Sequence, residues 1–338
     1  MQIFKGRWEV RKIDKDTCLN GGKITAAAIA AILFSNLLKL QFAPTAGIIT
    51  ILSIQKTKKE TLHTAGRRTL AFLIALLFAA VCFGIMGFGV TAFAVYLLLF
   101  SMTCLYFDWT EALAMDSVLI THFLTQKTME WSLLVNEMLL FFIGTSFGVL
   151  ANLYLKQKRE EFEVLADKVD EEICGILKRM SERLLEFDKS SYNGKCFLAM
   201  EEFVMRAKES AYRNYNNQLL GADHREIDYI KMREQQIEVL KHIYDSIKMV
   251  QSIPSQTKKI AALIVEIEAG YHKENTVEGF LQELQQLFRE MEQEPLPKDR
   301  KEFEARAVLF YMMKQLEEFL MLKKRYMMQY KQGGLSSE

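Results

Sequence analysis

The fold is decided by residues 69–88, which read TLAFLIALLFAAVCFGIMGF. This stretch carries no charged side chain. A helix of ~20 apolar residues is long enough to cross the ~30 Å hydrocarbon core of a bilayer. We therefore expect a transmembrane helix here and an all-α fold for the 338-residue chain.

Further apolar segments flank this stretch and predict a polytopic membrane protein with a six-helix transmembrane bundle. The segment at 90–107 follows almost at once, so Gly87 and Gly89 must form a tight turn. The last segment begins at Trp131 and ends near Tyr154, where interfacial aromatic residues are common. The predicted spans are 24–42, 43–55, 69–88, 90–107, 110–125 and 131–155.

Two of these segments are poorly suited to face lipid. The segment at 43–55 is too short to span comfortably, and the segment at 110–125 carries Glu111, Asp116 and His122. Short or polar segments persist in membranes when neighbouring helices shield them. We expect both inside the bundle. If neither crossed, four spans would remain.

The distribution of Lys and Arg predicts the orientation, because cytosolic loops are enriched in positive charge. The basic residues on one side of the predicted spans lie before residue 24, at 56–68 and after residue 155, whereas the other side has only Lys39 and Lys127. This bias places both termini in the cytosol.

The second half of the chain, at 156–338, is rich in Glu, Lys, Arg and Gln. Apolar residues at steps of three or four predict amphipathic helices, with Leu240, Ile243 and Ile247 among the buried positions. We expect the sixth span to continue into the first of these helices, and Asp299 to cap the last one. The prediction is a transmembrane domain at 1–155 and a cytosolic antiparallel helical bundle at 156–338, with helices at 156–188, 195–220, 222–252, 255–270, 276–293 and 299–331.

Several classes of function are disfavoured. The net charge of +1 argues against a nucleic-acid partner, which needs a basic face. The five scattered cysteines indicate neither a disulfide framework nor a zinc site. Phosphate-binding loops and catalytic motifs are absent from the sequence, so we expect no enzyme activity and no cofactor or metal.

Gly144 and Gly148 form a GxxxG pattern in the last apolar segment. Small residues at this spacing allow helix backbones to approach closely in lipid. Contacts within one bundle are the preferred interpretation, and a dimer seam is the alternative.

At this point a resemblance becomes visible. The residues KITAAAIAAILFSNLLKLQFAPTAGIITILSIQKTKKETLHTAGRR, at 23–68, resemble the start of the bacterial aromatic acid exporter family, which belongs with the fusaric acid resistance-like proteins and, more distantly, plant malate channels. The segments at 121–155, with its VNE and closing NLY, and at 296–320 are also similar to that family and its soluble domain. In this chain Lys56 replaces a proline usual in the family. The resemblance implies efflux of aromatic carboxylic acids by a homodimer in the plasma (inner) membrane of a bacterium.

An organic anion that crosses a membrane needs positive or hydrogen-bonding groups along its path. Basic residues at the predicted cytosolic end of segment 43–55 could concentrate anions, although positive-inside topology explains them equally well. Two polar residues early in the last span could line the path. The candidate path residues are Lys56, Lys58, Lys59, Arg67, Arg68, Asn136 and Glu137.

Asp116 and His122 are candidates for a proton relay, because ionisable groups within membranes are functional candidates and histidine titrates near neutral pH. Two helical residues that are six positions apart do not face the same side, so Asp116 and His122 are no obvious pair. Interhelical hydrogen bonding is the competing role for them. Three hypotheses follow: a proton-coupled exporter of aromatic or other organic acids, an organic anion channel of the malate-channel type, and a membrane-anchored interaction protein that acts through its cytosolic bundle.

Overall fold

The computed structural model describes residues 15–153, 159–187, 194–219, 221, 223–250, 252, 254–271 and 276–333. Over these residues the chain forms twelve helices and no strand, which confirms the all-α prediction. It divides into two compact units. The N-terminal unit comprises Met1–Lys156 with Asn216–Leu220, and the C-terminal unit comprises Gln157–Tyr215 with Gly221–Glu338.

The N-terminal unit contains six helices. Three of them are long and apolar enough to cross a membrane: Cys18–Leu37 of the first, the third and the sixth. The second and fourth are shorter apolar helices. Their bounds are α1 Lys15–Leu37, α2 Pro44–Ser53, α3 Lys58–Met86, α4 Val90–Tyr106, α5 Thr110–Gln126 and α6 Trp131–Leu153.

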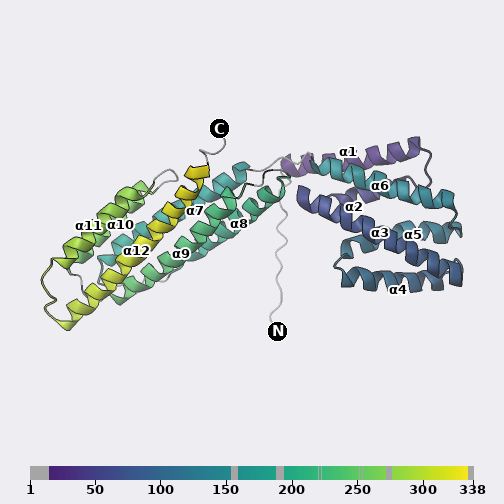
Figure 1. Ribbon diagram of the computed structural model, residues 1–338. Helices are drawn as coiled ribbons and strands as arrows, with labels where there is room; N and C mark the ends of the chain where they lie inside the picture. The colour runs from purple at the N-terminus through teal and green to yellow at the C-terminus, as the bar shows by residue number, and fades with distance from the viewer. Residues whose placement is uncertain are drawn as a thin grey trace. The chain divides into compact units, whose positions relative to one another are not determined.

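These helices pack as two groups of three. Helices α1, α2 and α6 contact one another, as do α3, α4 and α5, and α3 also packs against α6 (Figure 1). The short α2 begins at Pro44, whose fixed backbone angle suits a first helical position. The turn from α3 to α4 uses Gly87 at φ 74°, as the sequence predicts.

The GxxxG pattern of α6 packs against α2 of the same chain. A Cβ atom added at Gly144 would lie 2.5 Å from Ile49 Cβ, and one added at Gly148 would lie 2.6 Å from Ser53 Cβ. Thr50 Oγ1 also donates a hydrogen bond to the Gly144 carbonyl oxygen at 3.1 Å. The preferred interpretation, contact within one bundle, is therefore the one that the structure supports, since α2 occupies this face.

The C-terminal end of α2 is fixed by Asn152 of α6. Its Nδ2 donates to the backbone oxygens of Gln55 at 3.0 Å and Thr57 at 3.2 Å, and it also contacts the Thr61 hydroxyl. Thr57 caps α3 by accepting a hydrogen bond from the Glu60 backbone N–H at 3.3 Å. These side chains thus bind the backbone of Gln55 and Thr57 in the short connection between α2 and α3.

Two helix boundaries differ from the limits of the predicted spans. The first helix ends at Leu37 instead of residue 42, because Lys39 and Phe42 adopt positive φ values in the turn that leads to α2. The third helix begins at Lys58 instead of residue 69, because the Thr57 cap starts it within the basic stretch. The predictions for Tyr154 and for a continuous helix through residue 156 lie outside the described residues.

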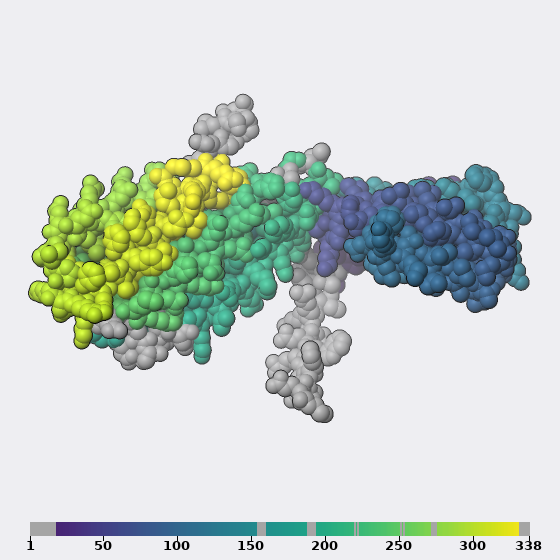
Figure 2. Space-filling model, turned by 60° about the horizontal axis from the view of Figure 1, so that its bottom comes forward, coloured from purple at the N-terminus to yellow at the C-terminus, as the bar shows by residue number. Residues whose placement is uncertain are grey.

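The C-terminal unit contains the other six helices. Helix α9 packs on α7 and α12, α10 packs on α7, and α11 packs on α10 and α12. In the space-filling view, α12 lies at the surface of this unit (Figure 2). Asp299 Oδ1 accepts a hydrogen bond from the Glu302 N–H at 2.8 Å, which confirms the predicted cap. The bounds are α7 Arg159–Leu184, α8 Cys196–Asn216, α9 Arg225–Met249, α10 Ser255–Gly270, α11 Glu278–Glu292 and α12 Arg300–Gly333.

A buried polar network crosses this bundle, where the sequence suggested only solvated charges. Arg233 is fully buried on α9 and pairs with Asp170 of α7, with 2.8 Å between Nη2 and Oδ1. The Tyr229 hydroxyl donates to the same carboxylate at 2.6 Å. Gln236 accepts from Arg233 Nη1 at 2.7 Å and donates to the Phe319 carbonyl oxygen of α12 at 2.7 Å. The network joins three helices, and its buried charge is paired as burial requires.

Candidate functional site

A buried acid–base pair joins α5 and α6 in the N-terminal unit. His122 Nδ1 lies 2.7 Å from Glu137 Oε2. Glu137 is fully buried, and His122 is 9% exposed. The second carboxylate oxygen of Glu137 accepts a hydrogen bond from Asn136 Nδ2 at 3.0 Å. An ionisable pair that is buried between helices of an apolar unit is a functional candidate.

The turn between α1 and α2 docks on this pair. The Gln41 N–H donates to Asn136 Oδ1 at 2.8 Å, and Asn136 Nδ2 donates to the Gln41 carbonyl oxygen at 3.1 Å. The Phe42 ring stacks on the His122 imidazole, with centroids 4.0 Å apart and planes 10° from parallel. One asparagine therefore connects the turn to the acid–base pair.

A cavity of about 370 Å³ opens beside the same asparagine. Its lining includes Lys39 and Gln41 from the turn, Gln126 at the end of α5, and Asn136 and Glu130 near the start of α6. The Lys39 ammonium group and the side-chain amides of Gln41 and Gln126 are suitable partners for a carboxylate. The Asn136 amide is already engaged by Gln41 and Glu137, and Glu130 adds one negative charge to the lining. The cavity and the buried pair share Asn136, so a ligand in the cavity can influence the pair through one side chain.

The residues of the predicted basic cluster differ in exposure. Lys56 and Arg67 are exposed, and Lys58 and Lys59 are partly buried in the first turn of α3. Arg68 is buried, because α3 begins earlier than predicted and carries it into the helical unit. Its Nη1 donates to the Leu52 carbonyl oxygen at 2.6 Å. This contact satisfies a carbonyl at the end of α2, where the helix dipole favours a positive charge.

Asp116 stands apart from His122. It is fully buried on α5, and neither carboxylate oxygen has a hydrogen-bond partner among the described residues. Its charge interacts with that of Arg68. Asp116 and His122, the two predicted relay residues, therefore have different surroundings. His122 is paired with Glu137, which the sequence predicted as a residue of the substrate path.

Nothing in the sequence indicates that Gln41 and Phe42 contact the site or that Lys39 lines the cavity. Polar side chains within apolar segments indicate candidate site residues. Gln41 binds Asn136 through its backbone, which no side-chain pattern indicates. In the sequence Phe42 is one apolar residue among many. In the structure its φ of 58° lies in a turn that places its ring against His122. These contacts depend on turn geometry, which hydropathy does not reveal.

Two family models match the chain. Residues 21–155 match "Aromatic acid exporter family member 1", and residues 159–324 match "Putative aromatic acid exporter C-terminal domain". Both parts of the predicted resemblance are thereby found, in the predicted order along the chain.

Two individual proteins are also similar. The "Uncharacterized protein YqjA" of Bacillus subtilis (strain 168) is 30% identical over 301 residues, which cover 89% of this chain and 93% of that protein. A crystal structure described as a "putative membrane protein from Clostridium difficile 630" is 26% identical with a TM-score of 0.43, and the match covers 49% of this chain and 98% of that one. The family models and the Bacillus relative together show that this chain is a membrane protein of the aromatic acid exporter family.

Proposed function

We propose that this protein is a secondary transporter that exports aromatic carboxylic acids or related organic anions, coupled to protons. The observation that carries the proposal is the buried His122–Glu137 pair and its link through Asn136 to a polar cavity with Lys39 on its wall. Family membership supports transport as the general activity. The cavity supplies the donors that a carboxylate needs, and the pair supplies groups that exchange protons.

The pair can couple proton binding to movement of the turn between α1 and α2. When Glu137 takes a proton, its carboxylate loses the negative charge that attracts an imidazolium at His122. Asn136 and Phe42 hold the turn against these two side chains. In our proposal a proton loosens the turn, which opens the cavity, and loss of the proton closes it again.

The topology that we propose has six crossings, with α2 and α5 inside the bundle and both termini in the cytosol of a bacterial cell. Helix α2 is too short to cross alone at ~1.5 Å per residue. Gln41, before α2, binds Asn136 near the start of α6, and Thr57, after α2, binds Asn152 near its end. Helix α2 and its flanking turns therefore extend parallel to α6. The C-terminal unit is then cytosolic, and a homodimer remains our proposal for the assembly.

Proteoliposomes test the transport proposal. Uptake of a panel of aromatic carboxylates is measured with and without a pH gradient, and again with an uncoupler. Transport that requires the gradient supports the exporter. Currents that need no gradient indicate a channel of the malate-channel type. An absence of flux for every anion would overturn the proposal in favour of an interaction protein that acts through the C-terminal unit.

Variants of the pair test the mechanism. His122→Gln and Glu137→Gln should abolish gradient-driven uptake, because each removes one titrating group. His63→Gln is the matched control, since His63 is exposed on α3 of the same unit. Uptake by the two pair variants at the wild-type rate would exclude the pair from coupling.

A further inference from the structure

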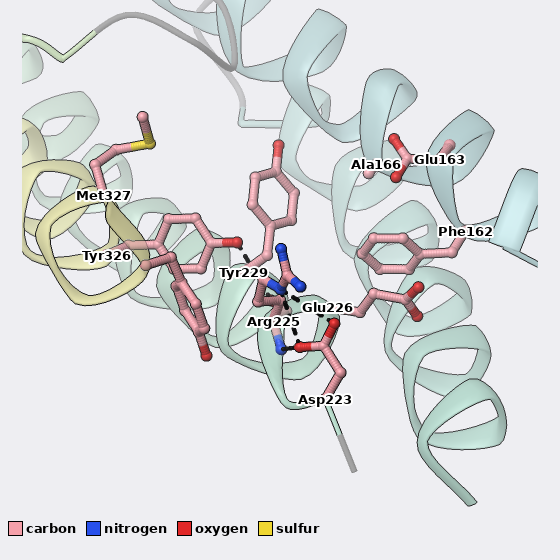
Figure 3. A pocket seen from close by; sticks show the side chains of 10 residues that line it. Phe162, Glu163, Ala166, Asp223, Arg225, Glu226, Tyr229, Tyr326 and Met327 are labelled. Carbon is pink, nitrogen blue, oxygen red and sulfur yellow. Dashed lines mark hydrogen bonds and ion pairs between the residues drawn. The ribbon is translucent and has the colours of Figure 1, made fainter. Parts of the chain in front are cut away.

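The C-terminal unit contains a separate cavity of about 490 Å³. It lies between α7, the start of α9 and the end of α12, so that three parts of the sequence build it (Figure 3). Its volume is in the range of sites that bind small molecules. The cavity belongs to the C-terminal unit alone, and the transport proposal does not use it.

Four aromatic rings form a continuous wall of this cavity. Phe162 of α7 meets Tyr229 of α9 edge to face at 6.3 Å between centroids, and Tyr229 meets Tyr326 of α12 at 5.7 Å. Tyr326 in turn lies 5.0 Å from Tyr330. In Figure 3, Tyr229 projects between Phe162 and Tyr326. Arg233 Cζ already lies 4.9 Å from the centroid of the Tyr229 ring, and Phe162 is buried, so Tyr326 and Tyr330 are the rings that offer most surface to a ligand.

The polar part of the lining is predominantly acidic. Glu163, Asp223 and Glu226 contribute carboxylates, and Arg225 contributes a guanidinium group. Arg225 Nε lies 3.1 Å from each oxygen of Asp223, and the Arg225 N–H donates to Asp223 Oδ1 at 3.0 Å. These two charges therefore offset each other. Glu163 and Glu226 add two further carboxylates to the lining, and Glu226 Oε2 accepts a hydrogen bond from Asn214 Nδ2 at 2.9 Å.

We propose that this pocket binds a small organic cation, an amine or guanidinium compound with an apolar body. The ring faces attract a cation through their quadrupoles, and the carboxylates attract it by charge. A carboxylate ligand would instead meet Glu163 and Glu226 as like charges, and it would have to displace Asp223 from Arg225. The ligand of this site thus has the opposite charge to the proposed transport substrate.

The pocket wall is held in place by the buried network of the bundle. The Tyr229 ring faces the cavity, while its hydroxyl donates to Asp170 and accepts from Arg233 Nη2 at 3.0 Å. On the opposite side, Tyr326 donates to the Arg225 carbonyl oxygen at 3.3 Å. The rings are fixed before a ligand arrives, which lowers the cost of ordering them on binding.

The test compares two ligands of similar shape and opposite charge. Phenethylammonium and 3-phenylpropionate are titrated by calorimetry into the full-length protein in detergent. We expect the cation to bind and the carboxylate to bind at least about tenfold more weakly, given the strength of cation–π and charge contacts. Equal or tighter binding of the carboxylate, or no binding of the cation up to millimolar concentration, overturns the proposal. Neither result depends on whether the protein transports anions.

Variants locate the site. Glu226→Gln and Tyr326→Leu should each weaken phenethylammonium binding by roughly fivefold, through loss of a charge and of a ring face respectively. Glu171→Gln is the matched control, since Glu171 is exposed on α7 outside the lining. Asp223→Asn leaves Arg225 without its carboxylate and should shift the preference toward 3-phenylpropionate. Cation binding that is unchanged in all three pocket variants would place the ligand elsewhere and refute the assignment.

Discussion

Asn136 and Asn152 of α6 bind the backbone at the two opposite ends of α2. Asn136 exchanges two hydrogen bonds with Gln41 before α2, and Asn152 donates to Gln55 and Thr57 after it. The two asparagines are about 24 Å apart along α6 at ~1.5 Å per residue. Helix α2 and its flanking turns therefore run along most of α6, and side chains of α6 bind backbone groups on both sides of the short helix.

Removal of either asparagine should destabilise the N-terminal unit. Asn152→Ala leaves two backbone carbonyl oxygens without their donor, and a lost buried hydrogen bond costs about 1–3 kcal/mol. We expect a lower melting temperature for the purified protein in detergent. Gln55→Ala is the control, because Asn152 binds only the Gln55 backbone and the side-chain change leaves that bond intact. Equal melting temperatures for both variants would show that the asparagine does not hold α2.

The glycines of α6 should not tolerate a methyl group. In Gly144→Ala the new Cβ would lie 2.5 Å from Ile49 Cβ and 2.7 Å from the Ala46 carbonyl oxygen, so that α2 must shift. Overpacking of this kind costs about 1–3 kcal/mol. Gly84→Ala on α3 is the matched control, because its Cβ would meet nothing within 4 Å and alanine favours a helix. Thermal unfolding separates the two, and a stable Gly144→Ala protein would contradict this packing.

The sequence was sufficient to predict the helices but not the contacts that end them. Hydropathy located α3, α4 and α6, and period-3.6 patterns located the helices of the C-terminal unit, because both signals depend on burial averaged over a whole helix. The N-terminus of α3 is set by the Thr57 cap, which lies well before the apolar stretch at 69–88. A single cap residue is a weaker signal in the sequence than that long apolar stretch.

The candidate site was visible only in part. Asn136, Glu137, Asp116 and His122 were identifiable because polar groups are rare in apolar segments. Which of them pair could not be predicted, since the partners belong to different helices whose relative rotation depends on packing. Arg233 shows the same limit in the C-terminal unit, where a residue within a charged helix is fully buried.

Lys39 should contribute to substrate binding. It supplies the ammonium group of the cavity beside Asn136, so Lys39→Gln should raise the KM for an aromatic carboxylate by roughly tenfold with little change in kcat. Lys127→Gln provides the comparison, because Lys127 is exposed at the end of α5 but does not line the cavity. Proteoliposome uptake at varied substrate concentration measures both constants. The same KM for both variants would argue against the cavity as the binding site.

Lys323 should make the stability of the C-terminal unit depend on pH. Burial, together with the charge of Arg233, lowers the pKa of Lys323 to about 8 from its ordinary value of 10.5. Its Nζ lies 4.2 Å from the centroid of the Tyr271 ring, and the side chain is 1% exposed. Between pH 8 and 10.5 Lys323 is protonated to a greater extent in the unfolded chain than in the folded one, so its contribution to stability rises with pH in this window.

The cost of burying the ammonium group is fully present below pH 8 and disappears as the pH rises toward 10.5. Lys323→Met removes this titration, so its melting temperature relative to wild type should be highest near neutral pH and decline above pH 8. The difference in the free energy of unfolding is on the order of 3 kcal/mol. Lys314→Met, at a half-exposed position of α12, should keep the wild-type pH profile. Parallel profiles for wild type and Lys323→Met would mean that Lys323 carries the same charge in the folded and unfolded protein across this range.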